Sequence, residues 1–166
     1  MRKLYFYLFL LFASLSNVNA QNYLIGHTTI TFVDASRSNR SIPTEIYYPA
    51  DITGDNVTIS TINTTKFPSL VFGHGFVMSW DAYQNFWNTL VPSGYIIAFP
   101  KTEGTISPSH LEFAKDLAFV INQMNLLGTQ NTSIFFNRVS NKNAVLGHSM
   151  GGGASFLSVP LNSNIS

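Results

Sequence analysis

A five-residue stretch, Gly147-His148-Ser149-Met150-Gly151, places one serine between two glycines. The apolar run 144–146 precedes it and small residues that can begin a helix follow it. The segment therefore predicts a strand, a sharp turn and a helix, with glycines where a side chain would collide with neighbouring backbone. Such a turn holds the Ser149 hydroxyl clear of the sheet, and the N-terminus of the following helix favours negative charge there. Ser149 is the candidate nucleophile.

A second glycine-containing turn, Gly73-His74-Gly75-Phe76, follows the apolar run 67–72. That run predicts a strand buried on both faces. The carboxyl ends of parallel strands gather at one edge of a sheet. We therefore expect the turn at 73–76, the loop 101–108 and Ser149 to share one rim, where a site would lie.

The rest of the chain alternates short apolar segments with segments of helical period. The expected strands are 24–33, 42–48, 67–72, 95–99 and 144–146, and the expected helices are 79–91, 109–128 and a third from Met150. The first two strands form an antiparallel hairpin ended by Pro49, and 51–66 is a polar surface connection. Ser79 is a predicted helix cap, and Ser109 with Glu112 forms a predicted capping box. The alternation predicts an α/β fold, a mostly parallel sheet with helices on both faces.

Composition narrows the function classes. The chain has 166 residues, about one domain, and only 10% of them are charged, against a typical value of about 25%. This argues against nucleic acid as a partner. The absence of cysteine excludes disulfides and thiolate catalysis. Four scattered histidines without a close acidic cluster give no metal-ligand set, and we expect no cofactor.

Residues 1–20 resemble a secretory signal peptide. Two basic residues precede a mostly apolar run over 4–15, and small or polar residues lead to Ala20. A membrane anchor is the alternative, but the run is shorter than the ~20 apolar residues that a spanning helix needs. We expect cleavage near Ala20, no membrane span, and a secreted or periplasmic mature protein.

The two glycine turns together resemble the α/β-hydrolase superfamily: Gly147 to Gly151 matches its nucleophile elbow and Gly73 to Phe76 its His-Gly oxyanion loop. With Gly147 to Gly153 and the upstream Ile-Tyr-Tyr-Pro at 46–49, the chain is similar to the secreted esterase and lipase branch. That branch includes dienelactone-hydrolase-like, chlorophyllase-like and polyester-hydrolase or cutinase-like enzymes. The resemblance covers roughly residues 24–157.

The resemblance implies roles for individual residues. Ser149 would attack an acyl carbon and form an acyl-enzyme that water cleaves. The backbone N–H groups of Phe76 and Met150 would bind the oxyanion. The motif glycines are Gly73, Gly75, Gly147 and Gly151. The implied substrate is a small-molecule or polymeric ester, while peptidase and thioesterase chemistry and the oligomeric state stay open.

The chain departs from the family pattern after the serine. In this superfamily the triad runs Ser, then Asp or Glu, then His, but residues 150–166 contain none of these acids and no histidine. His27 or His110 would need a geometry that the family does not use, and His74 and His148 are expected to shape their turns. We therefore expect 21–166 to be the N-terminal portion of one hydrolase domain, lacking its C-terminal strands and inactive alone. The alternative is a non-catalytic secreted binding domain or a degenerate remnant.

Overall fold

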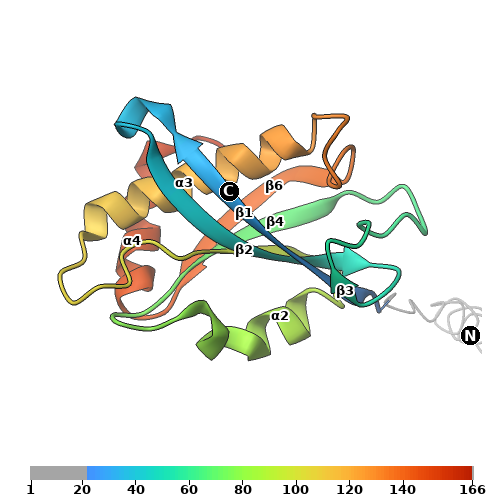
Figure 1. Ribbon diagram of the computed structural model, residues 1–166, viewed down its shortest axis with the longest axis horizontal. Coiled ribbons are helices and arrows are strands. Elements are labelled where there is room, and N and C mark those ends of the chain that lie inside the picture. Colours follow the sequence, from blue (N-terminus) through green and yellow to red (C-terminus); the bar gives the residue numbers. More distant parts are fainter. Residues whose placement is uncertain (1–21, 166) are drawn as a thin grey trace, which may run out of the picture.

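One six-stranded sheet runs through the molecule in the order β3-β1-β2-β5-β4-β6 (Figure 1). The computed structural model describes residues 22–165. The strands are β1 (Leu24–Asp34), β2 (Arg40–Ala50), β3 (Gly54–Asp55), β4 (Phe67–Gly73), β5 (Ile96–Pro100) and β6 (Val139–Gly147). β2 runs antiparallel to β1 and β5, whereas the other pairs, β1–β3, β4–β5 and β4–β6, are parallel. The predicted α/β class, with a mostly parallel sheet and an N-terminal antiparallel hairpin, is confirmed.

Helices cover both faces of this sheet (Figure 1). The α-helices are α2 (Gln84–Leu90), α3 (His110–Leu127) and α4 (Met150–Ser158), and short 3-10 helices span Ala35–Arg37, Trp80–Tyr83 and Val159–Leu161. α3 and α4 pack on one face, and α2 packs on the other. β6 is the last strand of the described sheet and pairs on one side only, with β4.

Two apolar clusters fill the spaces between the layers. Neighbouring strand residues point to opposite faces, so each strand contributes to both clusters. Ile46, Val71 and Ala98 face α3 and α4, and their neighbours Tyr47, Phe72 and Phe99 face α2. On the α2 side the rings of Tyr47 and Trp87 stack with centroids 4.3 Å apart.

Helix α3 follows its predicted bounds closely. The Ser109 side chain accepts a hydrogen bond from the Glu112 backbone N–H at 3.2 Å, and Gly128 caps the other end. Ser79 differs from expectation: it precedes the 3-10 helix at 80–83, but its side chain makes no capping hydrogen bond.

The prediction that Pro49 ends the second strand is wrong. β2 continues to Ala50, and Pro49 pairs with Ile25 of β1. The pairing between β2 and β5 covers only residues 44–47 of β2, so the missing N–H of Pro49 removes no hydrogen bond on that side.

The structure differs from two further predictions about strands. β6 begins at Val139, because β4 supplies backbone partners to its polar residues, including Ser69 opposite Asn143. β3, inside the expected surface connection, pairs with residues 26–27 of β1. A two-residue strand has no apolar pattern by which sequence could reveal it.

The predicted signal segment, residues 1–20, lies outside the described residues. Within 22–165, no helix has both the length and the apolar character needed to cross a membrane.

Candidate active site

Ser149 lies in the sharp turn between β6 and α4. Its backbone has φ 52° and ψ −115°, a strained conformation for a residue other than glycine. The side chain is exposed, and no other residue in 22–165 hydrogen-bonds its hydroxyl. Because α4 begins at Met150, the helix N-terminus lies beside the serine. The turn therefore presents a free hydroxyl to solvent.

The motif glycines allow this turn to lie directly on the end of β4. A Cβ at Gly151 would lie 2.0 Å from the Gly73 carbonyl oxygen, and a Cβ at Gly147 would lie 2.4 Å from the Gly151 carbonyl carbon. The His148 N–H donates to the Gly73 carbonyl at 3.0 Å. The serine turn and the loop after β4 therefore contact each other directly through backbone atoms.

The loop after β4 fixes the peptide unit that precedes Phe76. The Gly75 carbonyl oxygen accepts the Met78 N–H at 3.1 Å and lies 2.9 Å from His74 Nδ1. No peptide bond within 22–165 is cis, so the Phe76 N–H points away from that carbonyl. Neither this N–H nor that of Met150 donates to another group within 22–165. Both predicted oxyanion donors are therefore unoccupied.

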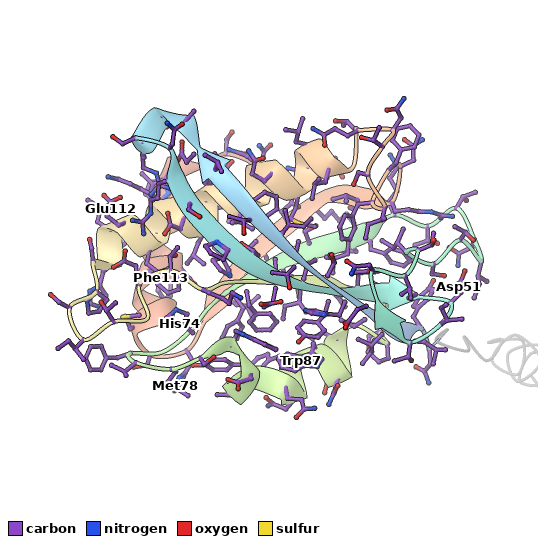
Figure 2. All side chains as sticks on the ribbon, viewed as in Figure 1. Asp51, His74, Met78, Trp87, Glu112 and Phe113 are labelled. Carbon is purple, nitrogen blue, oxygen red and sulfur yellow. The ribbon has the colours of Figure 1, made fainter. Side chains whose placement is uncertain are left out.

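His74 ties this loop to the loop that follows β5. The ring is buried against Phe113, with centroids 4.8 Å apart, and its Nε2 lies 2.8 Å from the Thr102 carbonyl oxygen. Figure 2 shows His74, Phe113 and Met78 together at the end of the molecule opposite Asp51. The position agrees with a histidine that shapes its turn.

Tyr83 is a residue of the site that sequence reasoning placed only in the core. Its hydroxyl accepts the Gly75 N–H at 2.7 Å and lies 3.1 Å from His148 Nδ1 and 3.2 Å from the Met78 sulfur. The helical spacing correctly indicates that Tyr83 is buried. Its hydroxyl connects the oxyanion loop to the serine turn, a contact that no sequence pattern reveals.

No described histidine ring hydrogen-bonds the Ser149 hydroxyl. The ring nitrogens of His74 face two carbonyls, and His148 contacts Tyr83. His27 lies between Glu45 and Asp55, at 2.9 and 2.7 Å. His110 is exposed at the start of α3. Residues 22–165 thus place the serine turn on the loop that carries the predicted oxyanion donor Phe76, and they show no histidine hydrogen-bonded to the serine hydroxyl.

The carboxylate beside His27 gives a pH prediction. Burial raises the pKa of Glu45, but hydrogen bonds from Lys101, Thr29 and His27 outweigh it and leave the pKa below its ordinary 4.5. A lowered pKa stabilises the fold above the ordinary value, and this contribution is lost as the pH falls through the folded-state value. We expect Glu45→Gln to be less stable than the unchanged chain at pH 7, and the difference to shrink below about pH 4.5.

Urea unfolding monitored by circular dichroism at a series of pH values measures this difference. Asp81→Asn is the control, because Asp81 is exposed and makes no ion pair or hydrogen bond through its side chain. A difference between Glu45→Gln and the unchanged chain that stays constant from pH 7 to acid would contradict the prediction.

Metal ligands do not cluster in the described structure: residues 22–165 contain no group of three His, Cys, Asp or Glu side chains that could hold an ion.

The family assignment comes from comparison with known proteins. The family model for chlorophyllase matches residues 32–164, most of the chain. The chain belongs to the chlorophyllase family. This confirms the resemblance to the α/β-hydrolase superfamily and its esterase-type branch. A search of curated proteins found no match to this chlorophyllase-family chain.

Solved structures show the same fold. The chlorophyllase-family chain is similar to the ferulic acid esterase from Streptomyces cinnamoneus, with a TM-score of 0.63 and 17% sequence identity. The match covers 92% of this chain and 59% of that esterase. The chain thus spans less than two thirds of the length of the esterase it matches.

Proposed function

We propose that Ser149 is the nucleophile of a carboxylic-ester hydrolase. The observation that carries the proposal is the strained serine, which has a free hydroxyl and lies in a turn packed on the end of β4, while the N–H groups of Phe76 and Met150 are unoccupied. Ser149 Oγ attacks the ester carbonyl carbon, and the two N–H groups stabilise the resulting oxyanion. Collapse of this intermediate expels the alcohol and leaves an acyl-enzyme, which water hydrolyses to the acid.

The acid and base of the reaction are assigned to residues outside 22–165. Two observations support this part of the proposal: no described imidazole hydrogen-bonds the Ser149 hydroxyl, and the chain spans only 59% of the esterase it matches. The chain alone is then inactive, because a serine without a base is a weak nucleophile. We propose a small-molecule or polymeric ester as substrate, and export directed by residues 1–20.

Chemical rescue tests the assignment of Ser149. Free imidazole is small enough to reach an exposed hydroxyl and to act in place of the missing base. Without imidazole, we expect the unchanged chain and Ser149→Ala to hydrolyse p-nitrophenyl butyrate at the same rate. With imidazole the unchanged chain should exceed the variant by about tenfold, a fraction of the 10²–10⁴ that a positioned base contributes.

The Ser149→Ala variant in the same imidazole buffer corrects for direct hydrolysis by imidazole. Mass spectrometry of the quenched reaction should show one acyl group on the unchanged chain and none on the variant. Equal rates for the two chains in imidazole, together with no acylation, would reject the assignment of Ser149 as the nucleophile. They would favour the second candidate, a non-catalytic secreted binding domain, which is supported by the absence within 22–165 of an imidazole hydrogen-bonded to Ser149.

A further inference from the structure

A cavity of about 250 Å³ opens beside the oxyanion loop, and His74 of that loop is one of its lining residues. Val77 and Met78, which follow that loop, and Trp80 of the 3-10 helix at 80–83 supply apolar lining, and Lys101 and Gly104 of the loop after β5 also line the cavity. Val77 directly follows the proposed oxyanion donor Phe76 in the chain, so the cavity begins at the end of the loop that would hold the ester carbonyl.

Other aromatic rings hold the indole of Trp80 in place. Trp87 and Tyr47 lie behind it, with ring centroids 5.6 and 5.9 Å from that of Trp80. His27 is stacked against it at 6.4 Å with an interplanar angle of 16°. Trp80 itself is half-buried and lines the cavity. A flat ring entering the cavity therefore meets an aromatic wall that is already ordered.

Lys101 supplies a hydrogen-bond donor whose charge is already neutralised. Its ammonium lies 2.5 Å from Glu45, and the other carboxylate oxygen accepts from Thr29 at 2.6 Å. The lowered pKa of Glu45 keeps this carboxylate ionised at neutral pH. An ammonium has three N–H groups, and Glu45 is the one partner of Lys101 Nζ within 22–165. Its remaining N–H groups suit a neutral oxygen better than a carboxylate.

The size of the cavity sets the size of its ligand. A closed apolar cavity of about 150 Å³ holds benzene, so this open cavity of about 250 Å³ has room for one substituted ring. We propose that this cavity binds a single aromatic ring carrying a neutral oxygen substituent, as part of the ester. The ring packs against Trp80 and Met78, and the oxygen accepts a hydrogen bond from Lys101. This inference rests on the proposed function, because it assigns the ring to the ester that Ser149 attacks.

Binding to the Ser149→Ala chain tests the inference without turnover. The probes are methyl 4-hydroxybenzoate and methyl cyclohexanecarboxylate, titrated into the ¹⁵N-labelled protein and followed by NMR. We expect the aromatic ester to bind about tenfold more tightly, and Trp80→Leu to remove most of this preference. Lys101→Met should remove the preference for methyl 4-hydroxybenzoate over methyl benzoate. Equal affinity for the aromatic and cyclohexyl esters would overturn the proposal.

Gly104 offers a matched pair of variants that spares the aromatic stack. A Cβ at Gly104 meets only the Lys101 carbonyl oxygen, at 3.9 Å. Gly104→Phe should therefore fold, fill the cavity and abolish binding, whereas Gly104→Ala should bind as before. Unchanged binding in Gly104→Phe would overturn the proposal. The binding assays use a chain without the nucleophile, so they can show binding even when imidazole rescue fails. A failure of this inference is therefore distinguishable from a failure of the proposed function.

Discussion

Replacing Asp116 by alanine is expected to lower the free energy of unfolding by about 3–5 kcal/mol. Asp116 lies on α3 with 0% of its surface exposed. Its Oδ1 accepts from Arg40 Nε at 2.8 Å, its Oδ2 accepts from Arg40 Nη2 at 2.7 Å, and Arg37 Nη2 lies 2.6 Å from Oδ1. Removing the carboxylate leaves two half-buried guanidinium groups with part of their hydrogen bonding lost. Urea unfolding at pH 7 measures the loss.

Asp81→Ala is the matched control for this substitution. Asp81 also lies in a helix, but its side chain is exposed and makes no ion pair, so the change should stay within about ±0.5 kcal/mol. Asp116→Ala should also loosen the loop after β5, because Arg40 binds Glu103 at 2.7 Å and Glu103 accepts the Ser109 N–H at 2.6 Å. A loss no greater than in Asp81→Ala would mean that the arginines find other partners.

The sequence predicts helix α3 but not its buried ion pairs. Helical spacing selects an apolar stripe that includes Leu111, Leu117 and Ile121. Leu117 and Ile121 are fully buried, whereas Leu111 is 50% exposed and Asp116 is buried instead. Spacing locates the side of a helix that faces the sheet. It does not show that Arg40, 76 residues away in sequence, makes burial of a carboxylate favourable.

Around Ser149, too, the sequence predicts the local features but not the contacts between distant residues. The glycine spacing predicts the turn, because the requirement for bare backbone is local and leaves a mark in the sequence. The contact of the Tyr83 hydroxyl with Gly75 and the cavity that Trp80 and Lys101 line depend on side chains from separate segments of the chain. Such contacts follow from how strands β4, β5 and β6 are placed, which a single sequence does not specify in detail.

Gly151→Ala is expected to lower the free energy of unfolding by about 3 kcal/mol or more. The added Cβ would lie 2.0 Å from the Gly73 carbonyl oxygen and 2.6 Å from the His74 carbonyl oxygen. Both atoms belong to backbone, so no side-chain rotation relieves the collision. The serine turn must separate from the end of β4, which moves the Met150 N–H relative to that of Phe76. Urea unfolding gives the loss, and NMR shifts of these two amides report the separation.

Gly153→Ala is the control in the same helix. A Cβ at Gly153 would meet no atom within 4 Å beyond the backbone of its own helix, and alanine in a helix is more favourable than glycine by up to about 1 kcal/mol. Gly153→Ala should therefore be as stable as the unchanged chain or more so, with the amides of Phe76 and Met150 unshifted. If Gly151→Ala gave the same stability and spectrum as Gly153→Ala, backbone contact would not hold the serine turn on β4. Ser149 and its two oxyanion donors would then lack the fixed geometry on which the proposed ester hydrolysis depends.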